Sequence, residues 1–296
     1  MKIPAITLLG CDSPMAGAVL HSLLEAELPL AEVLIAAPPP EPPSAHSLPV
    51  ARLDELAGGA KDAGICVRYC GADSVPAIHR ALEGGCELLL VACLRTILTS
   101  EIIGLARECV LNVHPSKLPA FRGPAPMFWQ LRDGLRETAV SVHAVTTRID
   151  AGAVLAHAPV ALPDDIHELA AEALAGAAAG EALRNALSDW PELQWRTQDE
   201  TAATYQRQPG PEDFRIDAQT WTAERAYRFM RATTWRRQPY PIHGSGWSAI
   251  ATHPLHVVET REGGEHAAPR QLDARTLELP FSEGLLAARG YWLDGG

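Results

Sequence analysis

Short apolar runs alternate with segments of helical periodicity along the first half of the chain. The runs at 5–10, 31–37, 87–93 and 109–114 are apolar almost throughout, and a shorter one lies at 64–69. Continuous apolar strands separated by helices are typical of a parallel sheet that is covered on both faces. We therefore predict an α/β domain with an open, parallel-centred sheet. The helices predicted between these strands cover residues 15–27, 75–84 and 99–108.

A strand pair and a long helix are predicted next. The segments 139–146 and 151–162 have the pattern of two strands that bracket the sequence "TRIDAG". Residues 164–187 form an Ala-rich helical pattern. Within it, Gly176 and Gly180 lower the helix propensity and leave room for close packing against a neighbour.

The pattern changes near residue 206. The segment "QRQPGPEDF" has the Pro and Gly of a linker, residues 223–234 have helical periodicity, and short alternating runs such as 255–259 and 276–281 follow. Short strands separated by Gly and Pro indicate a small β domain. The predicted domains are 1–205, the α/β domain, and 206–296, a linker helix with a small β-rich, OB-like domain.

The composition is that of an acidic globular protein. Hydrophobic residues make up 47% of the 296 residues, and the formal net charge is −11. An acidic chain gains nothing from a phosphate backbone, which argues against nucleic acid as a partner. No run approaches the ~20 apolar residues of a membrane span, and the N-terminal run is too short for a signal peptide. We expect a cytoplasmic protein without a membrane partner.

The cysteines indicate neither a disulfide framework nor a metal site. No two of them form a CxxC pair, and most lie in apolar runs, so we predict reduced, buried thiols and no metal. The loop "GCDSPMAG" after the first strand is also a poor match to GxGxxG, so the Rossmann-like sheet is not expected to bind a dinucleotide. The six cysteines are at positions 11, 66, 70, 86, 93 and 109.

Two polar residues stand at the end of an apolar strand. Residues two apart in a strand point the same way, so Asn112 and His114 would project together from the carboxyl end of "CVLNVH", where open α/β sheets bind ligands. Pro115 favours an extended geometry at His114. Taken alone, the pair is better explained by a turn cap at Asn112 and a packed polar residue at His114.

A carboxylate and a proline-glycine loop add to this pair. The segment "NVHPSKLPAFRGPAP", the tryptophan that follows and "IDAG" resemble the folate-dependent formyltransferases, which include the methionyl-tRNA, glycinamide ribonucleotide and sugar N-formyltransferases. The Asn-x-His, the loop and the Asp-x-Gly occur in the family's order, and Asp150 stands 38 residues after Asn112. The resemblance is clear over 86–160 and returns at 207–241. It implies the formyltransferase fold, with 1–205 as the catalytic domain.

The resemblance implies transfer of a formyl group from N10-formyltetrahydrofolate to an amine. Asn112 can donate an N–H to the developing oxyanion, and His114 has the ordinary pKa of a proton shuttle. Asp150 can orient His114 and favour its charged form. Whether His114 acts as a base or as a cation is left open.

The binding residues are expected on either side of this triad. By their position in the family, Arg95, Thr96, Ile97 and Leu98 line the folate slot, and Thr147 in "TTRID" closes its other side. Acceptor contacts are expected from the loop residues Ser116, Lys117 and Arg122, with Arg236 or Arg237 as further cations. The chain departs from the family at Lys117, where a leucine is usual, and at Ala139, where a glycine is usual. His143 and His157 alternate with apolar residues and are expected to be ordinary sheet residues.

The charge pattern favours a small-molecule acceptor. Where the tRNA enzymes carry a basic insertion, this chain reads "PPPEPPSAHSLPV", and the region from 209 has 10 Arg, no Lys and 11 acidic residues. We favour a nucleotide-linked amino sugar. Methionyl-tRNA, an amino acid, a hydroxylamine, and hydrolysis of the formyl donor remain alternatives. The hydrolase is disfavoured because the chain has no room for its N-terminal regulatory domain.

Two function classes outside this family are further alternatives. A non-catalytic nucleotide-binding module is disfavoured by the complete triad, and an oxidoreductase by the missing glycine fingerprint. The oligomeric state is open, with a homodimer as one option.

Overall fold

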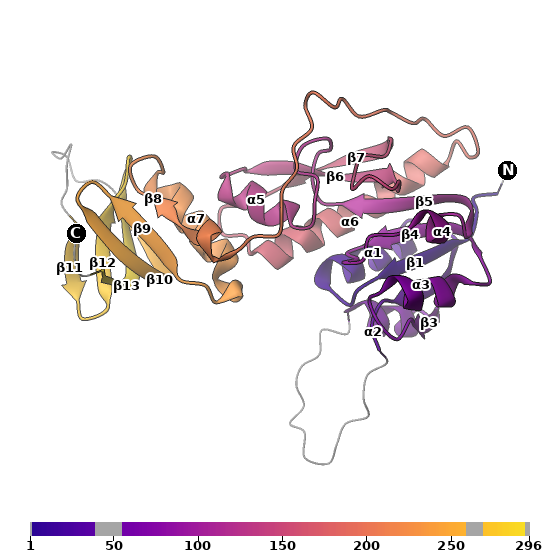
Figure 1. Cartoon of the computed structure of the whole chain (residues 1–296), viewed down its shortest axis with the longest axis horizontal. Helices are drawn as coiled ribbons and strands as arrows, with labels where there is room; N and C mark the ends of the chain where they lie inside the picture. The colour runs from indigo at the N-terminus through magenta and orange to yellow at the C-terminus, as the bar shows by residue number, and fades with distance from the viewer. Residues whose placement is uncertain (1, 39–54, 259–268, 294–296) are drawn as a thin grey trace, which may run out of the picture. The chain divides into compact units, whose positions relative to one another are not determined.

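The computed structural model describes residues 2–38, 55–258 and 269–293 (Figure 1). The chain divides into two compact units. The second unit takes in 128–136 and 162–168, which lie inside the range predicted for the first domain. The first unit comprises Met1–Met127, Glu137–Ala161 and Leu169–Gln206, and the second comprises Phe128–Arg136, Leu162–Glu168 and Arg207–Gly296.

The first unit is built on a seven-stranded sheet in the order β3-β2-β1-β4-β5-β6-β7. The strands from β3 to β5 are parallel, and β6 and β7 add to one edge in antiparallel fashion. Every residue of β1 is buried, as its unbroken apolar run predicts. The predicted parallel-centred α/β sheet is confirmed. Its strands are β1 Ile6–Gly10, β2 Leu30–Ile35, β3 Cys66–Tyr69, β4 Cys86–Ala92, β5 Ala106–His114, β6 Glu137–Ala144 and β7 Val154–Ala161.

Helices accompany this sheet, and one of them is shorter than predicted. The helix expected over 99–108 is confined to α4 (Ser100–Ile103), because Gly104 ends it and β5 begins two residues later, pairing with β4. The sequence pattern also missed α2 and α5. The helices that begin in this unit are α1 Pro14–Glu25, α2 Glu55–Asp62, α3 Val75–Leu82, α4 and α5 Pro126–Arg132.

The long helix α6 (Glu168–Leu187) packs against α1 through its glycines. A Cβ at Gly180 would lie 2.2 Å from the carbonyl oxygen of Ser22, and one at Gly176 would lie 2.6 Å from that of Met15. The hydroxyl of Ser22 donates a hydrogen bond to the carbonyl of Gly176 at 3.1 Å. Only glycine permits this approach, as the sequence pattern indicated.

The second unit holds a six-stranded sheet in the order β11-β12-β13-β10-β9-β8, together with α7 (Ala223–Thr233). Phe128, Phe214, Phe229 and Tyr240 pack at centroid distances of 5.3 to 6.2 Å and form its aromatic core. A β-rich second unit agrees with the sequence prediction. Its remaining elements are η1 Pro211–Phe214, β8 Ile216–Asp217, η2 Thr234–Arg236, β9 Tyr240–Gly244, β10 Trp247–Val258, β11 Arg270–Asp273, β12 Thr276–Pro280 and β13 Leu285–Trp292.

The six cysteines are free, but they are less buried than the sequence pattern indicated. Only Cys86 is buried, and Cys66 is exposed because β3 is the edge strand of the sheet. Burial raises the pKa of Cys11 to about 12 and that of Cys109 to about 11, so both remain thiols near neutrality. Among the described residues no cluster of His, Cys, Asp and Glu could hold a metal ion, and none of the helices there could cross a membrane.

Candidate active site

The carboxyl end of β5 presents Asn112 and His114 on one side of the strand, as their spacing predicts. The neighbouring strand β6 runs antiparallel, and its His143 stands directly opposite Asn112 in the register. The Nδ2 of Asn112 lies 3.2 Å from the Nε2 of His143. Two adjacent strands therefore contribute three polar side chains to one point of the sheet.

The ring of His114 is held by a main-chain acceptor. Its Nε2–H donates to the carbonyl oxygen of Phe121 at 2.9 Å, and the ring is almost fully buried. A carbonyl can only accept, so the Nε2 proton is fixed and the proton that His114 gains or loses is on Nδ1. That nitrogen lies 3.6 Å from Oδ2 of Asp150.

Asp150 reaches this point from the loop between β6 and β7. It adopts a left-handed conformation (φ 49°), which aspartate tolerates better than most residues. Its Oδ2 accepts from the backbone N–H of Gly123 at 2.8 Å, and its Oδ1 lies 3.5 Å from the Nε2 of His143. The carboxylate is thus placed between both imidazoles, and Asn112, His114 and Asp150 converge.

His143 is the site residue that sequence reasoning missed. Its Nδ1–H donates to the carbonyl of Ala144 at 2.9 Å, so in the neutral ring Nε2 accepts the Asn112 N–H. The amide nitrogen of Asn112 carries a second hydrogen, which this bond leaves available. The signal for His143 was its place in a strand predicted beside Asp150, but only the register with β5 puts it opposite Asn112.

The electrostatics of the site keep a neutral imidazole beside a charged carboxylate. Burial lowers the pKa of His114, although the Asp150 carboxylate opposes this. Burial alone would raise the pKa of Asp150, but His114, His143 and the Gly123 N–H together lower it to about 2. Near neutrality, His114 can therefore accept a proton at Nδ1, and the charge formed would face Asp150.

A cavity of about 400 Å³ opens onto these residues. The apolar side chains of Val91, Leu94 and Val145 contribute to its lining, and so do Glu172 and Tyr205. Of the residues expected to bind a cofactor, Thr147 is exposed and does not line it. Those that do line it are Arg95, Thr96, Ile97 and Leu98.

The site region matches a known sequence family. A sequence model described as "Formyl transferase" matches residues 75–183, which include Asn112, His114 and Asp150. The part of the chain that carries the site is therefore similar in sequence to the folate-dependent formyltransferases.

Two curated relatives and one solved structure show how far this likeness extends. Methionyl-tRNA formyltransferases of Thiobacillus denitrificans and Anaeromyxobacter dehalogenans are 32% and 36% identical over 197 and 186 residues. The matches cover 64% and 62% of this chain but only 60% and 57% of the relatives, so the chain spans less than two thirds of their length. The N-formyltransferase of Helicobacter canadensis, solved with folinic acid and dTDP-3-aminofucose, shares the fold at a TM-score of 0.64 with 14% identity, covering 98% of this chain and all of that one.

The loop residues that were expected to contact an acceptor do not line the cavity. Ser116 is fully buried, and its hydroxyl donates to the carbonyl of Ala120 at 2.8 Å. Arg122 is 6% exposed, and its guanidinium binds Gln198 and Glu200. Lys117 is exposed but does not line the cavity. Ser116 and Arg122 therefore do not contact an acceptor in this geometry, because their side chains are hydrogen-bonded to other residues of the protein.

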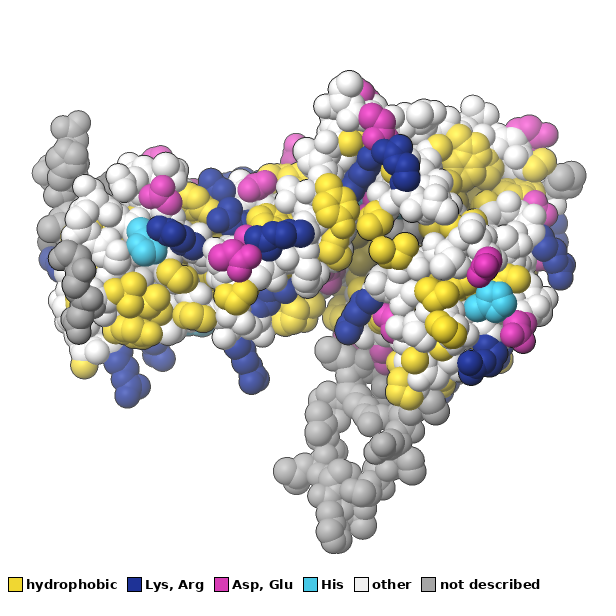
Figure 2. Space-filling model, viewed as in Figure 1, with side chains coloured by type: hydrophobic (Ala, Val, Ile, Leu, Met, Phe, Trp, Pro, Cys, Tyr) yellow, Lys and Arg dark blue, Asp and Glu magenta, His cyan; other side chains and the backbone are white. Residues whose placement is uncertain are grey.

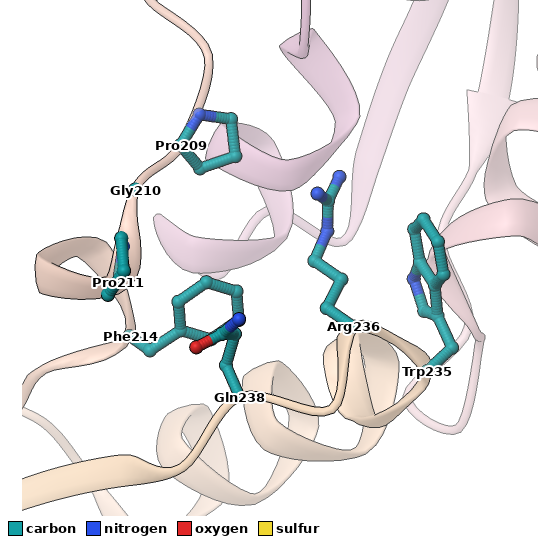
Figure 3. Close-up of a pocket in the computed structure, with 7 residues that line it drawn as sticks. All are labelled: Pro209, Gly210, Pro211, Phe214, Trp235, Arg236 and Gln238. Carbon is teal, nitrogen blue, oxygen red and sulfur yellow. The ribbon is translucent and has the colours of Figure 1, made fainter.

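Arg236, which was expected as a further cation for an acceptor, is also bound within the fold. It lines a separate hollow in the second unit together with Phe214, Trp235 and Gln238 (Figure 3). Its guanidinium binds both carboxylate oxygens of the buried Glu168, at 2.6 and 2.7 Å. This ion pair neutralises the positive charge of Arg236, which the binding of a diphosphate would require.

Replacing Gly152 of the Asp-x-Gly motif by alanine is expected to destabilise the fold by about 1–3 kcal/mol. The added Cβ would lie 1.8 Å from the carbonyl oxygen of Ala144, so the turn that carries Asp150 must shift. Urea unfolding measures the effect. The matched control is Gly84→Ala, where the Cβ meets nothing within 4 Å. Equal stabilities of the two variants would contradict this account of the motif glycine.

Proposed function

We propose that the chain is an N-formyltransferase that moves a formyl group from N10-formyltetrahydrofolate to a primary amine. The observation that carries the proposal is the convergence of Asn112, His114 and Asp150 at one cavity, within the segment that matches the formyl transferase family. We retain the division in which residues 1–205 hold the catalytic machinery.

Each side chain has a defined part in this proposal. The acceptor nitrogen attacks the formyl carbon, the bond from that carbon to the folate nitrogen breaks, and one proton moves from the amine to the departing nitrogen. The second N–H of Asn112 stabilises the oxyanion that forms on the formyl oxygen. His114 takes the amine proton at Nδ1, since Nε2 is bound to Phe121, and later returns it. Asp150 stabilises the imidazolium in between.

The cavity lining suits the formyl donor. Val91, Leu94, Leu98 and Val145 supply an apolar slot for an aromatic ring, and the loops on either side offer backbone groups for its polar edge. The donor would supply the activated formyl group. The residues of this chain would orient it and keep water away from the formyl carbon.

We propose a small-molecule acceptor, such as a nucleotide-linked amino sugar. On the face shown in Figure 2, Lys and Arg side chains stand apart and alternate with acidic and apolar ones, without one continuous basic surface. The net charge of −11 agrees with this. The Helicobacter canadensis neighbour was solved in complex with dTDP-3-aminofucose, a molecule of this class. The segment where the tRNA enzymes carry a basic insertion falls largely at 39–54, outside the described residues.

Methionyl-tRNA is the second candidate. It is favoured by the curated relatives at 32% and 36% identity, both of which are named methionyl-tRNA formyltransferases. Incubating the protein with N10-formyltetrahydrofolate and either amino-sugar nucleotides or methionyl-tRNA, followed by mass spectrometry of the acceptor, decides between them. Failure to formylate any amine would overturn the proposed function.

Initiator tRNA is expected to bind poorly at about 0.15 M salt, with no sub-micromolar affinity. Tight binding would require several Lys or Arg side chains on phosphates and would fall steeply with salt. Titrations at two salt concentrations measure this. Sub-micromolar binding that is lost at higher salt would reject the small-molecule acceptor and favour the tRNA enzyme.

A further inference from the structure

The main chain of the turn that carries Asp150 is hydrogen-bonded by the side chain of Gln198. This side chain is 7% exposed and comes from the extended segment that follows α6. Its Nε2 donates to the carbonyl oxygen of Asp150 at 2.8 Å and to that of Gly152 at 2.7 Å. Both hydrogens of the amide are thereby used, one on each side of Ala151.

The other end of the same amide is fixed by Arg122. The Oε1 of Gln198 accepts from Nε and Nη2 of Arg122 at 3.1 and 2.8 Å. The guanidinium is held in turn by Glu200, at 3.0 Å from Nη2. The amide therefore has no freedom to rotate or flip, because every polar atom has a partner in one fixed direction.

The loop that carries Arg122 also binds the side chain of Asp150. Gly123 follows Arg122 directly, and its backbone N–H donates to Oδ2 of Asp150 at 2.8 Å. Arg122 thus holds Gln198, which binds the main chain of Asp150, while the next residue binds the Asp150 side chain. These bonds hold Asp150 in its left-handed conformation, which aspartate tolerates better than most residues but which is still uncommon for a residue with a Cβ.

We propose that Gln198, fixed by Arg122, is a positioning residue that keeps the Asp150 carboxylate against His114 and His143 during formyl transfer. The proposal rests on the proposed function of the site. Gln198 does not line the cavity, so it acts through Asp150 and has no contact with the reacting atoms.

The test compares Gln198→Met with Gln194→Met. Methionine keeps the length of the side chain but removes both donors, and Gln194 is an exposed glutamine in the same segment. We expect Gln198→Met to lower kcat about 10- to 100-fold, with a smaller change in KM, because misplacing a catalytic group by about 1 Å can cost that much. The control should behave as wild type.

A double mutant distinguishes a positioning role of Gln198 from a general loss of structure. In an Asp150→Asn background, Gln198→Met should lower kcat by less than about twofold, since its effect passes through the carboxylate that is already gone. An equal loss in both backgrounds would overturn the proposal. Because Gln198→Met could fail to fold, Gln198→Glu serves as a second variant. It keeps the acceptor for Arg122 and loses the donors, so wild-type kcat in it would also overturn the proposal.

An imidazole titration by NMR tests the same inference without substrate. The groups facing the His114 ring are Asp150, His143 and the Phe121 carbonyl, and Asp150 is the carboxylate among them that raises the His114 pKa. Gln198→Met should lower the His114 pKa in the same direction as Asp150→Asn does, and Gln194→Met should leave it unchanged. A folded Gln198→Met protein with the wild-type His114 titration contradicts the positioning role, whether or not the wild type transfers a formyl group.

Discussion

Asp150→Asn is expected to lower kcat for formyl transfer at least about 100-fold while leaving the fold intact. The substitution keeps the shape of the side chain, but it removes the charge that lies 3.6 Å from Nδ1 of His114 and 3.5 Å from Nε2 of His143. Loss of that charge makes the imidazolium less favourable, so the pKa of His114 falls further below its ordinary value. Steady-state kinetics and the pH dependence of kcat measure the effect.

The control for this variant is Asp62→Asn, an exposed carboxylate at the end of α2. It changes the net charge by the same amount and should retain wild-type kcat. If Asp150→Asn transferred formyl groups at a near-normal rate, Asp150 would be a turn residue and the proton would need another route.

Asn112→Ala is expected to reduce kcat by about 100- to 1,000-fold, equivalent to about 3–4 kcal/mol of transition-state stabilisation. The variant removes the N–H that we assign to the oxyanion, and it also leaves His143 Nε2 without its 3.2 Å partner. KM for the donor should change less than kcat, because the interaction develops in the transition state.

The other asparagine of the chain provides the control, since Asn185 is exposed near the end of α6. Asn185→Ala should show wild-type kinetics. If Asn112→Ala raised KM for the formyl donor but preserved kcat, Asn112 would be assigned to binding of the formyl donor. The oxyanion would then have no side-chain hydrogen-bond donor.

The sequence was sufficient for the parts of the site that depend on local geometry. The i, i+2 spacing of Asn112 and His114 at a strand end places both on one side, whatever the rest of the fold does. The unbroken apolar runs likewise determine a buried parallel sheet. The place of Asp150 came from a family resemblance, because no local pattern relates it to a residue 38 positions earlier.

Contacts between distant segments were beyond the sequence pattern. His143 joins the site only through the register of β5 and β6, and shifting that register by one residue would turn its ring to the other face. Arg122 was expected to bind an acceptor, but its partners Gln198 and Glu200 are 76 and 78 residues away. An arginine in a proline-glycine loop has the same local pattern whether it binds a ligand or closes a buried network.

The rim of the cavity is exposed, in contrast to the buried hydrogen bonds that link Arg122, Gln198 and Asp150. Ile97, Tyr205 and Ile149 line the cavity yet are 61%, 56% and 38% exposed, and the Arg148 side chain beside them is 69% exposed. Under the proposed function, substitutions at Ile149 and Tyr205 alter which amine is admitted without removing a side chain that orients Asp150. Arg148 differs from them, because it donates to Glu200 at 2.8 Å and so belongs to the network that holds Arg122. Acceptor choice and reaction chemistry are then separately adjustable, so such a scaffold can acquire new substrates by changing a few surface positions while its reaction stays the same.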